Sequence, residues 1–311
     1  MHNGERGEKE VKKIKALLRL MRPEQWAKNV FLFAPLIFSK HLLNFSYLSK
    51  EIQAFIAFSL VSSFVYCIND VADRNADKLH PVKKNRPVAS GAVGVGEALV
   101  LAGVLLLLAA FIATPLGEGF VSCVLIYLFL NIWYSFSLKR VVLVDVFVVA
   151  SGYMLRILAG AYAIDVEISQ WLILCTLFIS LFLAISKRRG ELLLNSEQTY
   201  QSGRSVLKLY DVEFLDQLLT IVAAGTVISY ALYTVAERTI KVFGTENLIF
   251  TTVFVLFGIF RYIFLLHTRK TEDNPTRLIL SDIPLLVNIA AWFIVCIVII
   301  YFNDILLWIK Q

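Results

Sequence analysis

Charged residues are scarce in this sequence. They make up 17% of its 311 residues, whereas a soluble domain carries about 25%. Hydrophobic residues reach 58%, above the roughly 45–50% that is usual for soluble domains. A soluble core cannot bury that excess, so the composition excludes a water-soluble enzyme and a disordered chain. The sequence therefore predicts a polytopic membrane protein.

Cysteine and histidine are also few, with four of each. The cysteines, at positions 67, 123, 175 and 296, lie inside apolar segments, and no pair has the spacing of metal ligands. We interpret them as small buried hydrophobes. The histidines do not cluster, so nothing indicates a zinc site. The glycines at 91, 94 and 96 lack the Lys-Ser/Thr of a nucleotide-binding loop, so we expect no such loop here. Separately, we expect no nucleic-acid partner.

Long apolar segments dominate the rest of the chain. Nine are long enough to cross or nearly cross a bilayer: 29–44, 52–68, 98–116, 119–136, 141–164, 170–186, 217–236, 248–267 and 283–302. The first is the weakest, because it is short and contains Pro35 and Lys40. Lipid offers no hydrogen-bond partners, so each segment must be helical. The predicted fold is an all-α bundle of about nine transmembrane helices.

The basic residues predict the orientation in the membrane. With the N-terminus in the cytoplasm, 23 of the 30 lysines and arginines lie in cytoplasmic segments and four in opposite loops. We expect a cell (inner) membrane protein with a basic cytoplasmic tail, 1–20, and a single transmembrane catalytic domain, 21–311. Its two long cytoplasmic loops, 69–97 and 187–216, have room for a site that faces the cytoplasm.

An ordered acidic row follows the second apolar segment. Asn69, Asp70, Asp73 and Asp77 fall within an arc of about 100° on a helix. Carboxylates stacked on one face repel each other unless a cation lies among them, and Mg²⁺ suits such oxygen ligands when a diphosphate is nearby. Basic residues come directly after the row: Lys78, His80, Lys83, Lys84 and Arg86. A Mg²⁺–diphosphate site is the sharper interpretation, and a solvated acidic helix end is the alternative.

Four motifs together resemble one known family. They are RPEQWAKN at 22–29, the stretch from Asn69 to Gly91 with the pattern NDxxDxxxDxxHPxKxxRPxAxG, a segment with Tyr134, Leu138-Lys139, Asp145 and LRILAG at 155–160, and KRRGEL at 187–192. This set resembles the UbiA-type intramembrane prenyltransferase superfamily, in particular its decaprenyl-phosphate phosphoribosyltransferase branch. The resemblance covers residues 20–200 well and the last three helices by topology only.

One departure from the wider superfamily bears on the substrate. Typical members have a second aspartate row after the sixth helix, whereas this sequence has the basic SKRRGEL there. Basic residues at that position favour additional phosphate groups over a second metal. That suits phosphoribosyl pyrophosphate as donor and a polyprenyl phosphate as acceptor, whereas an uncharged aromatic acceptor does not need such cations.

The resemblance implies a Mg²⁺-dependent transfer of 5-phosphoribose from phosphoribosyl pyrophosphate to a polyprenyl phosphate, with release of diphosphate, in cell envelope biosynthesis. The residues that it implies for catalysis are Asp70, Asp73, Asp77, Lys83, Tyr134 and Lys139, of which the three aspartates are the metal ligands. Those implied for substrate binding are Lys28, Asn29, Asn69, Arg86, Arg140, Arg156, Lys187 and Arg188. Arg156 lies inside a helix, where a charge is expensive, so it either meets a phosphate or forms a structural ion pair.

Two other functions stay open at this point. One is a UbiA-type prenyltransferase that attaches the chain of a prenyl diphosphate to an aromatic acceptor. The other, from a different class, is a transporter of a phosphorylated solute, although no inverted repeat or broken helix is evident. The polyprenyl chain length, the downstream pathway, the number of Mg²⁺ ions and any homo-oligomeric state are not predicted.

Overall fold

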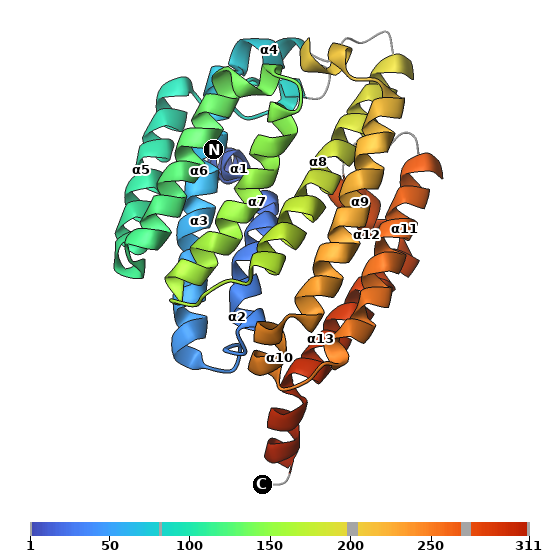
Figure 1. The fold of residues 1–311 in the computed structure, drawn as a ribbon. Helices are drawn as coiled ribbons and strands as arrows, with labels where there is room; N and C mark the ends of the chain where they lie inside the picture. Colours follow the sequence, from blue (N-terminus) through green and yellow to red (C-terminus); the bar gives the residue numbers. More distant parts are fainter. Residues whose placement is uncertain (1, 81–82, 198–204, 269–274, 310–311) are drawn as a thin grey trace. The chain divides into compact units, whose positions relative to one another are not determined.

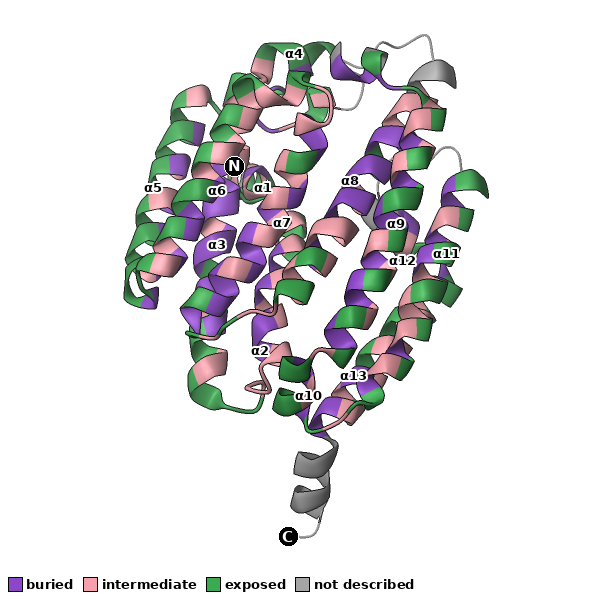
Figure 2. Ribbon diagram, in the orientation of Figure 1, coloured by how far each residue is buried: buried purple, intermediate pink, exposed green. Residues whose placement is uncertain are grey.

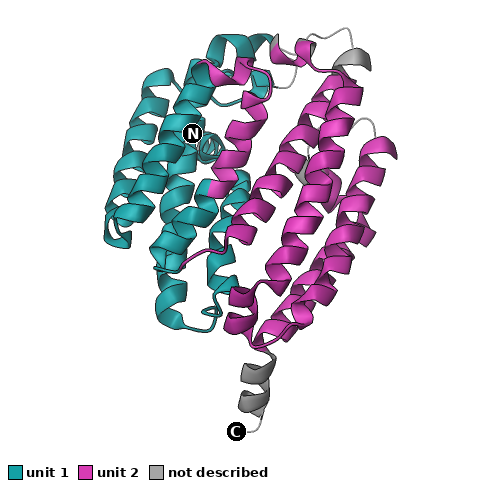
Figure 3. Ribbon diagram, in the orientation of Figure 1, with its two compact units in different colours: residues 1–136, 155–166 teal, residues 137–154, 167–311 magenta. Residues whose placement is uncertain are grey.

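Every regular element in the described part of the chain is a helix (Figure 1). The computed structural model describes residues 2–80, 83–197, 205–268 and 275–309. The chain forms two compact units: unit 1 comprises residues 1–136 and 155–166, and unit 2 comprises residues 137–154 and 167–311 (Figure 3). Helix α7 (Val144–Ala163) contributes its first half to unit 2 and its second half to unit 1. The predicted all-α fold is confirmed.

Eight helical segments within the described residues are long and apolar enough to cross a membrane. They are α3 (Phe45–Ala72), α5 (Val95–Ala113) with η3 (Thr114–Leu116), α6 (Glu118–Phe136), α7, α8 (Gln170–Glu197), α9 (Val212–Val235), η6 (Asn247–Thr251) with α11 (Thr252–Thr268), and α13 (Ile283–Ile309). These agree with eight of the nine expected segments.

The first expected segment, 29–44, has a different structure. It consists of the end of a 3₁₀ helix, η1 (Pro23–Phe33), followed by the short helix α2 (Ala34–Phe38). Pro35 has no N–H to continue the hydrogen bonding of η1, and Lys40 adopts a left-handed conformation with φ of 64° just beyond α2. This segment is therefore too short and too irregular to count as a spanning helix.

Unit 1 is organised around α3. This helix packs along α5 and also contacts η1, α6 and α1 (His2–Met21). One apolar cluster includes Phe58 of α3, Phe120 of α6 and Leu32 of η1, and a second joins α1, α3, α5 and residues 88–93. Gly160 of α7 permits a close approach to η1, because a Cβ there would lie 2.2 Å from the carbonyl oxygen of Leu32.

Unit 2 is organised around the α8–α9 pair. Its other elements are η4 (Leu138–Arg140), η5 (Ser205–Leu209), α10 (Glu237–Phe243), α11, α12 (Pro275–Leu280) and α13. Arg189 of α8 pairs with Asp216 of α9 at 2.6 Å and donates to the Leu266 carbonyl of α11 at 2.9 Å. Helix α8 continues to Glu197, so residues 187–197 are helical where the sequence suggested that a loop begins.

Large apolar side chains are exposed along the outer faces of the spanning helices (Figure 2). On α5, for example, Val100, Leu107 and Phe111 are 69%, 74% and 78% exposed. In a water-soluble protein such faces would promote aggregation. They are the surfaces expected to contact lipid.

Candidate functional site

The turn between α1 and η1 places the guanidinium of Arg22 against Asp70 of the acidic row. Arg22 adopts a left-handed backbone conformation, with φ of 53° and ψ of 60°, which is uncommon for a residue other than glycine. Its Nη2 lies 2.5 Å from Oδ1 of the buried Asp70. The Trp26 indole donates to Ser63, and Ser63 donates to the Met21 carbonyl, so the turn is fixed to α3 on both sides of Arg22.

Arg86 joins the first and last carboxylates of the row. Its Nη1 lies 2.6 Å from Oδ2 of Asp77 and 3.7 Å from Oδ1 of Asp70. Helix α3 ends at Ala72, and a new short helix, α4 (Arg74–Leu79), carries Asp77. Asp73 lies at the junction with φ of −88° and ψ of 3°. The row thus lies on two successive helices, not on the single continuous helix that the spacing suggested.

The oxygen donors of the row fit a magnesium ion. Among the described residues, no group of three or more His, Cys, Asp or Glu side chains is arranged to hold a metal. Mg²⁺ does not need such a group, because it commonly uses one or two carboxylates together with phosphate oxygens and water. Oδ2 of Asp70 is buried and has no hydrogen-bond partner within the described residues, which leaves it available to a cation. Asp73, three residues further along the chain, is half-buried.

Asn69, the first residue of the motif, is held by α6. Ser135 donates to Oδ1 of Asn69 at 2.6 Å and also to the Asn131 carbonyl at 2.8 Å. Tyr134 is half-buried on the same last turn of α6. The end of α6 is thereby fixed against the end of α3, where the acidic row begins.

A buried polar network in unit 1 links η1 with α7. Nε of Arg156 donates to Oδ1 of Asn29 at 2.7 Å, and Nη2 donates to the Tyr127 hydroxyl at 3.2 Å. The Arg156 guanidinium also lies over the rings of Tyr127 and Phe58. Nδ2 of Asn29 donates to Ser59 of α3 at 2.9 Å. Asn29 and Arg156, both predicted from the sequence as substrate contacts, are therefore in direct contact with each other.

Arg188 belongs to a second polar network, in unit 2. Its Nε lies 2.5 Å from Oδ2 of Asp145, and its Nη1 lies 2.7 Å from Glu191. The Tyr210 hydroxyl donates to Oδ1 of Asp145 at 2.8 Å and accepts from the backbone N–H of Leu143 at 2.7 Å. Burial raises the pKa of Tyr210 to about 12, so its hydroxyl stays protonated and able to donate at neutral pH. Arg188 was expected to bind phosphate, but its guanidinium is buried and engaged with two carboxylates.

The remaining predicted cations are more accessible. Lys28 in η1, Lys83 in η2 (Lys83–Asn85) and Lys139 in η4 are half-buried, whereas Arg140 and Lys187 are exposed. Burial, together with the charge of Lys83, lowers the pKa of His80, so that ring contributes little positive charge at neutral pH. Lys28 and Lys83 belong to unit 1, and the other three residues belong to unit 2.

Three contributors to these networks were not predicted from the sequence. Arg22 was considered only as part of the RPEQWAKN motif, and its contact with Asp70 was not foreseen; Tyr127 and Tyr210 were not singled out. For Arg22 a signal existed, since an arginine directly before Pro23 opens the RPEQWAKN motif. Tyr127 and Tyr210 carried none, because each is one of 12 tyrosines and lies in an apolar or irregular context.

Comparison with known proteins identifies related sequences. The model of the UbiA prenyltransferase family matches residues 42–188. A decaprenyl-phosphate phosphoribosyltransferase of Corynebacterium glutamicum is 37% identical over 222 residues, which cover 70% of this chain and 66% of that protein. The enzyme of the same name from Mycobacterium tuberculosis is 37% identical over 227 residues, covering 71% of this chain and 74% of that protein.

A solved structure has the same fold. A UbiA homologue from Archaeoglobus fulgidus bound to GPP and Mg²⁺ superposes with a TM-score of 0.69 at 21% sequence identity. The match covers 92% of this chain and 99% of the other. At that identity the likeness establishes the arrangement of helices alone.

Proposed function

Because the chain belongs to the UbiA prenyltransferase family, we propose that it is a membrane phosphoribosyltransferase of that family. It transfers 5-phosphoribose from phosphoribosyl pyrophosphate to a polyprenyl phosphate and releases diphosphate. The observation that carries this proposal is the 35–37% identity to decaprenyl-phosphate phosphoribosyltransferases over about 70% of the chain.

The reaction needs charge stabilisation more than proton transfer. An oxygen of the lipid phosphate attacks the anomeric carbon of the ribose, and the bond from that carbon to the diphosphate breaks, with its electron pair leaving on the diphosphate. The acceptor is already an anion, so no general base is required.

The residues of unit 1 supply cations and fixed carboxylates for the donor. Arg86 and Lys83 would donate to diphosphate oxygens, and Arg22 holds the Asp70 carboxylate in position. Asp70, Asp73 and Asp77 would hold a Mg²⁺ ion. That ion neutralises charge on the leaving diphosphate when it is bound.

The buried Arg156 network would also contribute to substrate binding. Asn29 accepts from Arg156, and Lys28 precedes Asn29 in the chain. We assign Arg156 and Asn29 to the orientation of a phosphate group. Asn69, which Ser135 holds at the end of α3, is assigned to substrate binding, and Tyr134 on the last turn of α6 to a catalytic contact with the donor. A guanidinium that already lies over two aromatic rings is partly desolvated, which strengthens its attraction to an anion.

In unit 2, Lys139, Arg140 and Lys187 are proposed as cations for further phosphate oxygens. Arg188 is assigned a positioning role, because Asp145 and Glu191 already bind its guanidinium. The protein is placed in the cell (inner) membrane with its N-terminus and acidic row in the cytoplasm, as the distribution of basic residues suggests.

A competition between two donors tests this function. The purified protein in detergent with Mg²⁺ receives equal amounts of phosphoribosyl pyrophosphate and a prenyl diphosphate, each with a different label, together with a polyprenyl phosphate and an aromatic acid. The proposal predicts that only the ribose label enters the lipid phase, and that a chelator abolishes this transfer. Coupling of the prenyl label to the aromatic acid, without ribose transfer, would instead establish a prenyltransferase.

A further inference from the structure

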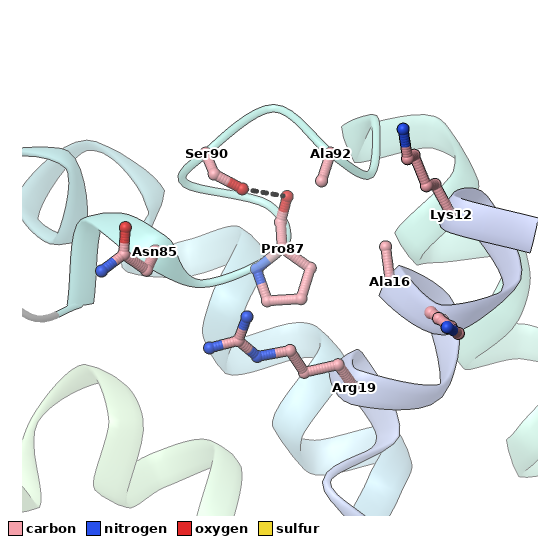
Figure 4. A pocket seen from close by; sticks show the side chains of 8 residues that line it. Lys12, Ala16, Arg19, Asn85, Pro87, Ser90 and Ala92 are labelled. Carbon is pink, nitrogen blue, oxygen red and sulfur yellow. Dashed lines mark hydrogen bonds between the residues drawn. The ribbon is translucent and has the colours of Figure 1, made fainter. Parts of the chain in front are cut away.

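Helix α1 presents three exposed basic residues on one side. Lys12, Lys15 and Arg19 are spaced three and four residues apart, so they fall within an arc of about 60°. All three line a pocket of about 220 Å³. Its opposite wall consists of Asn85, Pro87, Ser90 and Ala92 (Figure 4). We call this the α1 pocket.

Both walls of the α1 pocket are held in place by the core of unit 1. Leu20 of α1 is fully buried, and it shares an apolar cluster with Cys67 of α3 and with Val88 of the opposite wall. Lys13, on another side of α1, forms an ion pair with Glu97 in the first turn of α5. Ser90 donates to the Pro87 carbonyl at 3.3 Å within the wall. The pocket therefore exists before any ligand binds.

An exposed apolar stripe runs beside the basic residues. Val11, Ile14 and Leu18 are 51%, 57% and 51% exposed, and they also fall within an arc of about 60°. Helix α1 is seen nearly end-on in Figure 1, whereas α3, α5 and α6 of the same unit run up the page. A helix that crosses spanning helices in this way, with basic and apolar stripes side by side, has the features of a helix that lies in a membrane interface.

We propose that the α1 pocket binds the headgroup phosphate of an anionic phospholipid, whose acyl chains lie along Val11, Ile14 and Leu18. Lys12 has a counter-charge, because it pairs with Glu8 at 2.8 Å. Within the described part of the chain, no ion pair involves Lys15 or Arg19. The pocket thus carries excess positive charge, which attracts an anionic headgroup and repels the ammonium group of a zwitterionic one.

The α1 pocket adjoins the acidic row through the backbone. Asn85 and Pro87 of the pocket wall immediately precede and follow Arg86, whose guanidinium binds Asp77 and reaches Asp70. A headgroup that immobilises this wall would also restrict Arg86. Lipid binding would thereby reduce the motion of the Arg86 guanidinium, which lies between the Asp70 and Asp77 carboxylates.

Native mass spectrometry of the full-length protein tests the proposal without any turnover. The protein is incubated with phosphatidylglycerol or phosphatidylcholine in detergent, and bound lipid is counted. We expect preferential retention of phosphatidylglycerol, and about 30-fold weaker binding for K15Q/R19Q, since each basic residue contributes about fivefold near anionic headgroups. I14Q/L18Q keeps the charge and should also bind phosphatidylglycerol more weakly, because it removes the apolar contact.

The control variant is K50Q/K241Q, which removes two exposed lysines elsewhere and should retain the lipid like the wild type. Thermal unfolding of each variant confirms that it is folded. Equal retention of the two lipids by the wild type, or undiminished binding by K15Q/R19Q, would overturn the proposal. Displacement of the lipid by inorganic phosphate would overturn it as well, since the site would then bind free phosphate. These outcomes do not depend on the transfer reaction.

Discussion

At the scale of single residues, two carboxylates and two guanidinium groups hold each other in a small region of unit 1. Asp70 is 1% exposed and contacts Arg22 and Arg86. A buried carboxylate without a cation is costly, so the attraction to these groups compensates the unfavourable left-handed backbone of Arg22. We propose that Arg86, which is 26% exposed, also meets phosphate oxygens when a donor binds.

Replacing Arg22 tests this electrostatic coupling. R22Q should lower the free energy of unfolding by about 3 kcal/mol, because it leaves Asp70 buried without its nearest cation. D70N in the same chain should recover much of that loss, since the neutral amide no longer needs a cation. Chemical denaturation of the two single variants and the double variant measures the coupling. If the changes in the free energy of unfolding of the two single variants simply added up in the double variant, the Arg22–Asp70 pair, at 2.5 Å, would contribute nothing to stability.

Replacing the other carboxylates tests the chemistry. D73N and D77N should each reduce ribose transfer at least about 100-fold while the proteins stay folded, because each removes a charged oxygen ligand. The control is D211N, in which an asparagine replaces the aspartate that caps α9 and caps equally well. Transfer at several Mg²⁺ concentrations is the measurement. Full activity of D73N and D77N at low Mg²⁺ would exclude these aspartates as metal ligands.

The sequence pattern predicted part of this site. The spacing of Asp70, Asp73 and Asp77 is local, so a row of carboxylates at the end of an apolar helix was evident from the sequence. Arg22 lies 48 residues from Asp70 along the chain, and only the folded turn before η1 brings the two together. No periodicity encodes such a contact.

At the scale of elements, the close packing of α7 on η1 fixes the Arg156–Asn29 contact. G160A should destabilise the protein by about 1–3 kcal/mol, because the new Cβ would lie 2.2 Å from the Leu32 carbonyl and the backbone of η1 would have to move. In G103A, in α5, the new Cβ would have no atom within 4 Å, so this variant should be as stable as the wild type or more stable. Unfolding temperatures in detergent compare the two variants. Equal unfolding temperatures for G160A and G103A would show that the backbone of η1 can move away from α7 at no cost in stability.

Tyr210 connects two segments of unit 2, because its hydroxyl binds both Leu143 and Asp145 and because η5 packs against η4. Leu143 has φ of 66°, an unfavourable conformation that the Tyr210 hydrogen bond helps to maintain. Y210F should raise KM for the ribose donor about tenfold with a smaller change in kcat, since η4 carries Lys139 and Arg140. Steady-state kinetics are the measurement.

Glycine at position 143 provides the matching test. Glycine adopts positive φ without strain, so L143G should restore KM in the Y210F background if Tyr210 acts by holding this turn. Y262F is the control, because Tyr262 is another buried tyrosine that bonds Ser186 instead of the 137–145 segment. If Y262F raised KM as much as Y210F does, the effect of Y210F would be a general loss of stability.

Elements with a simple hydropathy pattern were predicted well, and irregular ones were not. The apolar stretch 29–44 contains Pro35 and a left-handed Lys40, so its hydrophobicity did not translate into a long helix. Residues 187–191 include four charged side chains, which favoured a loop in the prediction. Tertiary ion pairs, such as that of Arg188 with Asp145, keep them helical instead.

At the scale of the whole molecule, eight helical segments in the described part of the chain are long and apolar enough to cross a membrane, and the distribution of basic residues predicts their orientation. Cysteine labelling tests the orientation with little background, because Cys67, Cys123 and Cys296 are buried and Cys175 is half-buried. S90C should react with an impermeant thiol reagent only from the cytoplasmic side. S46C, in the first turn of α3, should react only from the opposite side. Reaction of both from one side would contradict the orientation.

The membrane location followed from the composition, which is 58% hydrophobic, and the helical class followed from the long apolar segments, because lipid offers the backbone no hydrogen-bond partners. The division into two compact units did not follow, because no linker or shift in composition marks the boundaries at 136–137, 154–155 and 166–167. One of these boundaries, at 154–155, falls within α7. Contacts between distant helices determine them, and a local sequence pattern does not.

Product analysis in a defined reaction tests the central claim most directly. The purified protein is given phosphoribosyl pyrophosphate, Mg²⁺ and decaprenyl phosphate, and both the extracted lipid and the aqueous diphosphate are quantified by mass spectrometry. If the protein is a phosphoribosyltransferase, the lipid becomes heavier by one phosphoribosyl group and is formed in equal amount to the released diphosphate. Diphosphate release without the heavier lipid, or an unchanged lipid with unconsumed donor, would contradict this claim.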